Sequence, residues 1–259
     1  MRKIIFLLCL TATLMLSSNL GASEPEKNLY RKVIEIGKAK DVKTELSFLA
    51  GELQIDGTSE GLAECYYGYK KDFIRPELSY YEVDKTGYLS IKSESLKDKD
   101  LDDIHKDDNK WRLSLNNHVR NSVAINLKAG EANIDLEGCN LSRFEYRMFA
   151  GESNINLRNT SVPTVMFNLT AGEANVDLSG SWQNDLVATI KGGVGELNIK
   201  VPYNTGVRIT VSGLLGDINI PFFNRDGRTF TNDKYGKTKN TLYIDINGGI
   251  GEIKVDMVE

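Results

Sequence analysis

The sequence has few side chains of the kind that bind transition metals. It contains 2 histidines and 3 cysteines among 259 residues, and none of these stand at the short spacings that zinc ligands adopt. The sequence therefore predicts no metal site, and it carries no motif for another cofactor.

Long apolar runs are missing after the first 23 residues. Residues 1–23 begin with two basic side chains, continue through an apolar run from Ile4 to Leu16 and end in small and polar residues, which is the pattern of a secretory signal peptide. No later stretch approaches the roughly 20 apolar residues of a membrane-spanning helix. We therefore expect an exported mature chain, periplasmic or at the cell surface, without a transmembrane segment.

An excess of positive charge is also missing. The chain has 32 basic and 36 acidic residues. Removal of the leader takes away two basic residues and no acid, which leaves 30 − 36 = −6. A mildly acidic surface argues against nucleic acid as a partner.

No complete catalytic motif is present. Gly57–Gly61 matches the G-x-S-x-G nucleophile elbow, but an elbow needs a helix after the serine, and residues 62–70 have the aromatic character of a strand. We therefore interpret this stretch as a turn rich in Gly and Ser and expect the protein not to be an enzyme. Two cysteines, Cys65 and Cys139, remain after the leader, and the sequence leaves open whether they form a disulfide or stay free.

What the sequence does contain is one phrase, repeated. INLKAGEANIDL, from Ile125 to Leu136, returns in close variants, each with a glycine before an acidic residue. These marker glycines are Gly51, Gly130, Gly151, Gly172, Gly195, Gly216 and Gly251. From Gly130 to Gly216 consecutive markers are 21 or 23 residues apart, and a period near twenty residues carried by strand-like units is typical of a solenoid.

Each repeat alternates apolar and polar residues on both sides of its glycine. In the copy around Gly130, Val123, Ile125 and Leu127 precede the glycine at every second position, and Ala132, Ile134 and Leu136 follow it in the same way. This is the period of half-buried strands. The sequence therefore predicts an all-β fold, a β-solenoid-like stack of two-strand repeats of about 21 residues, preceded by a small β-subdomain.

The polar positions of the repeats form rows if like positions stack. One row is acidic and another is mostly Asn, and together with the following Asp they are the candidate binding surface. Its residues are Glu131, Asn133, Asp135, Glu152, Asn154, Glu173, Asn175, Asp177, Glu196 and Asn198. The alternatives are a solvated set of corner carboxylates and a surface that holds a cation or a ligand.

The repeats also suggest how the chain is divided. We expect an N-terminal β-subdomain over residues 24–118, which includes the first repeat, and a repeat domain over residues 119–259. A basic, aromatic insertion at residues 222–240 interrupts the last repeats and is either a tolerated hairpin or a contact surface. Its candidate contact residues are Arg225, Arg228, Lys234, Tyr235 and Lys237.

The order of these features resembles a known family. GELQIDG at residues 51–57, WRLSLNNHV at 111–119, the serial AGE repeats after Ala129 and GGIGEIKVDM at 248–257 are similar to the toast-rack family, which is related to LiaF-like and adhesin-like proteins of the bacterial cell envelope. The resemblance implies a stacked β-architecture in the envelope and no catalysis.

The leading interpretation is an exported, non-enzymatic binding or structural module at the cell envelope. The expected partner is an envelope polysaccharide or an envelope protein. Two alternatives are a regulatory partner in envelope-stress signalling, as the LiaF-like branch implies, and a carbohydrate-active β-helix enzyme. The enzyme would need two carboxylates at working separation in a cleft.

Overall fold

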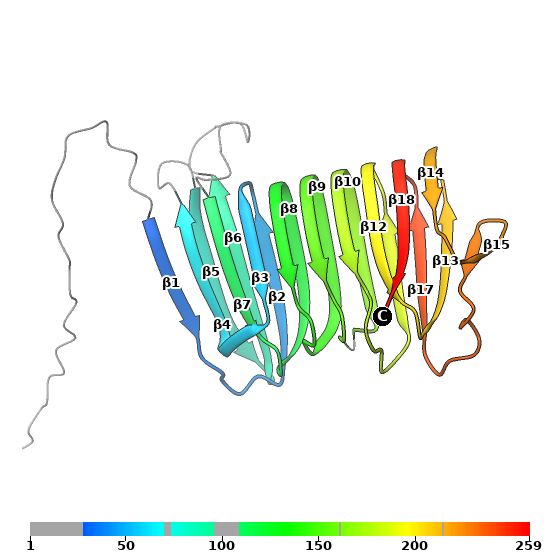
Figure 1. The fold of residues 1–259 in the computed structure, drawn as a ribbon. Coiled ribbons are helices and arrows are strands. Elements are labelled where there is room, and N and C mark those ends of the chain that lie inside the picture. Colours follow the sequence, from blue (N-terminus) through cyan, green and yellow to red (C-terminus); the bar gives the residue numbers. More distant parts are fainter. Residues whose placement is uncertain (1–27, 70–73, 96–108, 161, 214) are drawn as a thin grey trace, which may run out of the picture.

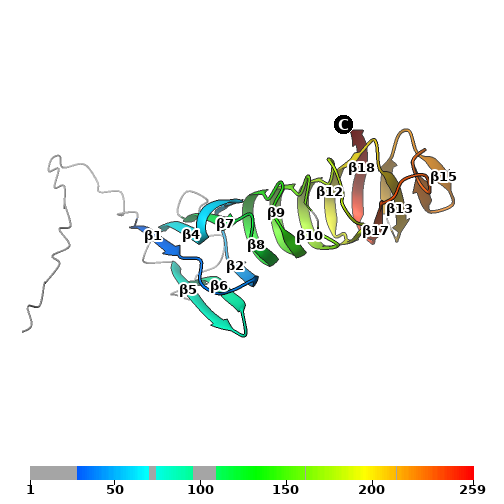
Figure 2. The ribbon, with the colours of Figure 1, turned by 90° about the horizontal axis from the view of Figure 1, so that it is seen from below.

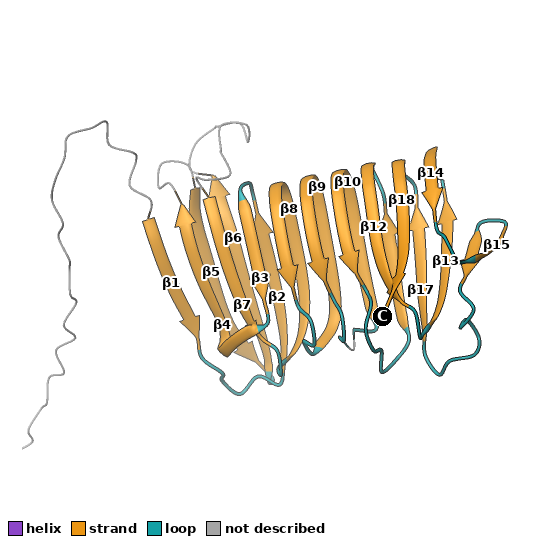
Figure 3. Cartoon of the chain, viewed as in Figure 1, coloured by secondary structure: helices purple, strands orange, loops and turns teal. Residues whose placement is uncertain are grey.

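The structure is a computed structural model, and it describes residues 28–69, 74–95, 109–160, 162–213 and 215–259. The expected signal peptide and most of the Lys- and Asp-rich stretch before Trp111 lie outside the described residues. The described part contains strands and no helix (Figure 3). The all-β, solenoid-like prediction is confirmed.

Two layers of strands run the length of the molecule, and three long strands belong to both (Figure 1). The strands that pass from one layer to the other are β8 (Arg120–Asp135), β9 (Leu141–Asn156) and β10 (Thr164–Asp177). In the first sheet, the strands on the β8 side are, in spatial order, β5 (Ile74–Val83), β6 (Thr86–Ser95) and β2 (Asp41–Phe48), and β2 pairs with β8. On the β10 side, the order is β11 (Leu186–Lys191), β17 (Thr241–Asn247), β13 (Gly206–Ser212), β16 (Thr229–Thr231) and β15 (Asn224–Asp226). In the second sheet, the strands on the β8 side are, in spatial order, β1 (Asn28–Ile34), β4 (Thr58–Tyr69), β7 (Asn109–Asn116) and β3 (Glu52–Asp56), and β3 pairs with β8. On the β10 side, the order is β12 (Val194–Pro202), β18 (Ile250–Val258) and β14 (Leu215–Asn219).

The apolar side chains of the two sheets face each other and form the core. In β8, Ile125 before the corner and Ile134 after it are 1% and 2% exposed. In register, Ile134 lies beside Ile155 of β9, and Ile155 lies beside Val176 of β10. Burial of each such side chain stabilises the fold by roughly 1.5–3 kcal/mol, so the alternation read from the sequence is the basis of the core.

The corner between the sheets is built from glycine because successive coils touch there. Gly151 has φ +140°, and a Cβ added to it would lie 1.9 Å from the carbonyl oxygen of Gly130. The same close approach, at 1.8 to 2.1 Å, recurs at the other marker glycines of the stack. No residue with a side chain fits such a position. The strand continues through the corner at Gly130, Gly151 and Gly172, whereas it is interrupted at or next to the corner in the copies of Gly51, Gly195, Gly216 and Gly251.

The coils do not all stack in sequence order. β17 and β18, which come last in the chain, lie between β11/β12 and β13/β14. The insertion at residues 222–240 makes this crossover, and its β16 pairs with β13 in antiparallel fashion. β15 and β16 thereby cover the edge of the first sheet, an edge that would otherwise be open to pairing with other chains.

At the N-terminal end the two sheets splay apart. Figure 2 shows the β5–β6 hairpin diverging from β1 and β4. β6 and β7 pair with β2 and β3 and so complete one further coil. The N-terminal strands are therefore extensions of the same two sheets, and the boundary at residues 118 and 119 stays a prediction.

The two cysteines are free and buried, which excludes the disulfide among the two alternatives. Cys65 lies opposite Leu113 of β7. The Cys139 sulfur lies beside Gly57, and Gly57 is a spatial neighbour of Asn117, which is four residues after Leu113. Four residues of extended chain span about 13 Å, so the two cysteines lie further apart than the Cα separation of about 7 Å that a disulfide allows. Burial raises the pKa of each thiol to about 11.

Among the described residues there is no helix that is long and apolar enough to cross a membrane.

Candidate functional site

An open groove lies on the outer face of the second sheet. It has a volume of about 790 Å³. It runs across strands β7, β3, β8, β9, β10, β12 and β18. Seven strands at a spacing of about 4.8 Å span about 29 Å, so this polar groove has the form of a site for an extended ligand.

The floor of the polar groove is a row of amide side chains, here called the amide row. It consists of Gln54, Asn133, Asn154, Asn175 and Asn198. Asn154 donates from Nδ2 to Oδ1 of Asn133 at 3.1 Å, Asn175 donates to Asn154 at 3.1 Å, and Asn198 donates to Asn175 at 3.0 Å. Such ladders hold identical side chains in register, and the floor is therefore rigid and evenly spaced.

Cations stand at both ends of the amide row. Arg112 of β7 lies beside Gln54, and Lys254 of β18 lies beside Asn198. The row is therefore a neutral floor between two positive ends.

One side of the groove carries a second polar row with mixed charge. Its members are Asp56, Asp135, Asn156, Asp177, Lys200 and Asp256. Asn156 separates two acids of this row and donates from Nδ2 to Oδ1 of Asp135 at 2.9 Å. Repulsion between neighbouring carboxylates is thus reduced inside the row.

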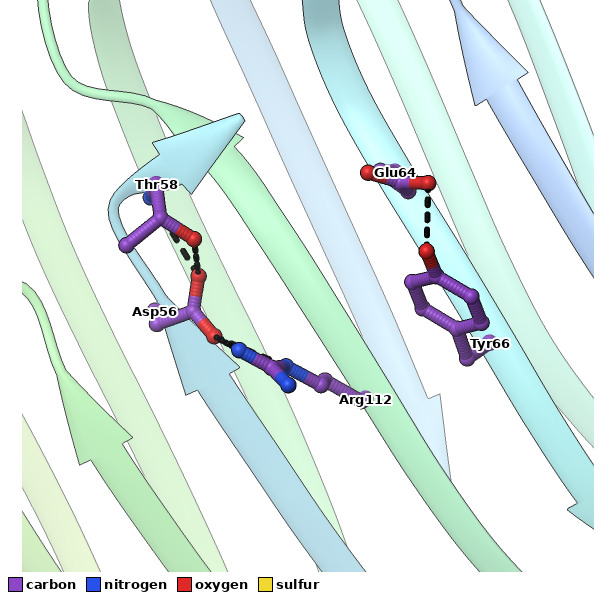
Figure 4. Close-up of polar contacts among 5 residues, drawn as sticks. All are labelled: Asp56, Thr58, Glu64, Tyr66 and Arg112. Carbon is purple, nitrogen blue, oxygen red and sulfur yellow. Dashed lines mark hydrogen bonds and ion pairs between the residues drawn. The ribbon is translucent and has the colours of Figure 1, made fainter. Parts of the chain in front are cut away.

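Asp56 is the best-held carboxylate of the groove (Figure 4). Its Oδ2 accepts a hydrogen bond from Nε of Arg112 at 3.0 Å, and its Oδ1 accepts from the backbone N–H of Thr58 at 3.2 Å. Burial by itself would raise the pKa of Asp56, but hydrogen bonds from Thr58, Ser114 and Arg112 outweigh burial and lower the pKa below its ordinary value. Asp56 therefore carries its charge and fixes the Arg112 guanidinium at this end of the groove.

The ten residues predicted as a binding surface lie together on this face. Six of them line the groove: Asn133, Asp135, Asn154, Asn175, Asp177 and Asn198. The other four, Glu131, Glu152, Glu173 and Glu196, form a row in register beside it, nearer the glycine corner. Their role in binding stays a prediction.

Sequence reading found Asp135 and Asp177 but missed other charged members of the groove. Lys200 and Asp256 follow their marker glycines at the same distance as Asp135 and Asp177, so extending the row along every repeat could have found them. Arg112 carries no repeat signal, because its strand belongs to the coil that lacks the repeated phrase. Only the pairing of β7 with β3 places it there.

The five candidate contact residues of the insertion lie elsewhere. Arg225 belongs to β15, at the far end of the first sheet (Figure 1). Its guanidinium carbon lies 5.3 Å from the ring centroid of the buried Phe230. The structure does not bring the group Arg225, Arg228, Lys234, Tyr235 and Lys237 to the polar groove, and a contact role for it remains a prediction.

The described residues show no catalytic elbow and no metal-binding cluster. Ser59 is buried on β4, which begins at Thr58, so the expected turn at Gly57–Gly61 was wrong. The stretch is extended because the Asn116 side chain donates to the carbonyl oxygens of Ser59 and Gly61 at 3.1 and 3.0 Å. No group of three His, Cys, Asp or Glu side chains comes together as metal ligands in the part of the chain that the structure describes.

The fold defines a class: an open stack of two-strand β-coils whose polar side chains are aligned from coil to coil. Within this class the chain belongs to the toast-rack family. Residues 22–172 and 144–200 match the family described as the N-terminal domain of toast_rack.

Two solved structures of bacterial proteins are similar to the chain. A Clostridium sporogenes protein provisionally named a cell adhesion protein is 26% identical, with a TM-score of 0.67 over 90% of this chain and 100% of that one. A Bacteroides fragilis protein provisionally named an adhesin is 11% identical, with a TM-score of 0.35 over 90% of this chain and 99% of that one. No curated protein matches the chain.

Proposed function

We propose that the chain is an exported, adhesin-like binding protein of the cell envelope and that the polar groove is its binding surface. The observation that carries the proposal is the groove itself, a floor of amides in hydrogen-bonded register that crosses several coils. Repeat proteins bind extended ligands on such surfaces. The provisional name of the Clostridium sporogenes protein supports the same role.

The arrangement of the groove carboxylates supports a non-enzymatic role. Asp56 is held charged by Arg112 and Thr58, and Asp135 accepts from Asn156. A general acid would need a carboxyl with a raised pKa, and the Asp56 pKa is lowered instead. We infer that these groups bind and orient a ligand and do not transfer protons to it.

The test is binding of the purified chain to isolated envelopes of the source organism, measured by co-sedimentation. Replacing Asn154 and Asn175 together by Leu removes two floor amides, and we expect envelope binding to fall at least tenfold. The matched control replaces Asn126 and Asn168 by Leu. These two Asn residues lie on the outer face of the first sheet, in the pairing row that also contains Arg147.

The control pair should bind envelopes like the unmodified chain, because it alters the same residue type on the opposite face. Equal loss in both pairs, or no binding by the unmodified chain, would refute the proposed function.

A further inference from the structure

The polar groove continues at its N-terminal end onto an aromatic side chain. Tyr66 of β4 lies beside Arg112 in the same register row as Gln54. A further depression of about 550 Å³ begins here and shares Gln54 and Arg112 with the polar groove. Its other lining residues include Tyr30 and Leu29, which are 50% and 88% exposed. One end of the groove is therefore aromatic.

Tyr66 is held in a fixed orientation. Its hydroxyl donates to Oε1 of Glu64 at 2.7 Å (Figure 4) and accepts from Nε of Arg31 at 3.0 Å. The Arg31 guanidinium carbon lies 5.6 Å from the centroid of the Tyr66 ring. The hydroxyl is thus occupied in both directions while the residue remains 40% exposed. What Tyr66 offers a ligand is the ring.

The charges that line the polar groove nearly cancel. Its carboxylates are Asp56, Asp135, Asp177 and Asp256, and its cations are Arg112, Lys200 and Lys254. Four negative and three positive groups give 3 − 4 = −1. A strongly charged polymer of either sign would therefore meet like charges along the groove.

The amide row retains hydrogen-bonding capacity toward solvent. Asn154 and Asn198 each give one Nδ2 hydrogen to the ladder, and a side-chain amide has two such hydrogens. Each therefore keeps a second donor for a ligand. Together with the Asp oxygens, the groove offers both donors and acceptors at the spacing of the strands.

We propose that the ligand of the polar groove is a linear, uncharged polysaccharide that lies across the strands, with one sugar ring packed on Tyr66. A sugar hydroxyl both donates and accepts hydrogen bonds, which matches amides and carboxylates, and the C–H face of a sugar ring packs on an aromatic ring. A cationic peptide would instead meet Arg31 and Arg112 at the aromatic end. This inference rests on the proposed function and specifies its ligand.

The role of the ring is tested with three variants in the envelope co-sedimentation assay. Tyr66→Leu removes the ring and should weaken binding about five- to tenfold. Tyr66→Phe removes only the occupied hydroxyl and should stay within about twofold of the unmodified chain. Tyr203→Ala is the control, because Tyr203 is also exposed, at 53%, but does not line the groove.

The chemistry of the ligand is tested on the envelopes themselves. Periodate, which cleaves sugar diols, should abolish binding, and proteinase K treatment of the envelopes should leave it intact. Binding that survives periodate, or equal losses in Tyr66→Leu and Tyr66→Phe, would overturn the inference. Binding that is lost only after proteinase K would leave the proposed function standing with a protein as partner, whereas no binding to untreated envelopes removes the proposed function itself.

Discussion

Single residues decide whether neighbouring coils can approach one another. At the corner, the carbonyl oxygen of Gly130 occupies the place where a Cβ of residue 151 would stand, 1.9 Å away. Gly138, by contrast, has φ +67° and no atom within 4 Å of an added Cβ. Both glycines have a positive φ, but +67° lies in the left-handed region that other residues can adopt and +140° does not, and only Gly151 has an atom in the place of an added Cβ.

This difference gives a prediction about stability. Gly138→Ala should cost about 1 kcal/mol, the penalty of a left-handed conformation. Gly151→Ala should cost at least about 2 kcal/mol more, because the coils must also move apart. Urea unfolding measures both free energies. Equal costs for the two substitutions would show that coil contact at the corner is not what requires glycine.

A second residue-scale prediction concerns pH. Because the folded-state pKa of Asp56 is lowered, its charge stabilises the fold above the ordinary carboxyl pKa, and this contribution is lost as pH falls through the folded-state value. Asp56→Asn should therefore cost about 1–3 kcal/mol at pH 7 and less at pH 3, which lies below the ordinary carboxyl pKa. Urea unfolding at both values checks this.

Asp226→Asn, at an exposed position in β15, should change stability little at either pH. If the cost of Asp56→Asn did not change with pH, the hydrogen bonds from Arg112 and Thr58 would not depend on the charge of Asp56.

At the scale of elements, each strand contributes one side chain to every row. The same interaction between neighbouring side chains is therefore repeated from strand to strand along the row. Glu131, Glu152 and Glu173 are register neighbours on adjacent strands, about 4.8 Å apart. Replacing all three by Gln should leave the fold intact and raise the free energy of unfolding by about 0.5 kcal/mol or more.

Thermal unfolding in low and high salt tests this, since screening should remove the gain. A triple variant that fails to fold, or that folds only with an added cation, would show that the glutamates hold an ion.

The elements also explain how much of the fold could be predicted from sequence. The repeated phrase fixes the alternation of Ile134 and Asn133, and therefore the two sheets, the core and the amide row. It does not fix which coil lies beside which, because β12, β14 and β18 all carry the same phrase, and nothing in the phrase shows that β18 lies between the other two. The phrase also does not place Tyr66 or Arg112 on the groove face, because β4 and β7 lack it. These strands reach that face only because β7 pairs with β3 and β4 pairs with β7.

At the scale of the whole molecule, the last coil lies inside the stack. Lys254 is therefore a register neighbour of Asn198, and Asn219 lies one strand further away. With cysteines at positions 198 and 254, a disulfide should form readily, because paired strands meet the distance that a disulfide requires. With cysteines at positions 198 and 219, about 9.6 Å apart, it should not form.

Mass spectrometry after mild oxidation distinguishes the two variants, and the native thiols Cys65 and Cys139 are buried. The opposite result would mean that the coils stack in sequence order, and the polar groove would then end differently.

The outer faces of the two sheets should differ in whether a bound ligand covers their carboxylates. The groove face contributes Asp135 and Asp177 to its lining, whereas Glu45 and Asp245 are exposed carboxylates on strands β2 and β17 of the first sheet. Among the described residues, only the groove face has a continuous amide row between its carboxylates. A ligand that binds there should cover one set of acids and leave the other open to solvent.

Carboxyl footprinting of the chain on and off isolated envelopes measures this most directly. The polar groove as binding surface predicts that Asp135 and Asp177 lose labelling by carbodiimide and amine when envelopes are present, while labelling of Glu45 and Asp245 is unchanged. Protection confined to Glu45 and Asp245, or equal protection of all four, would contradict it.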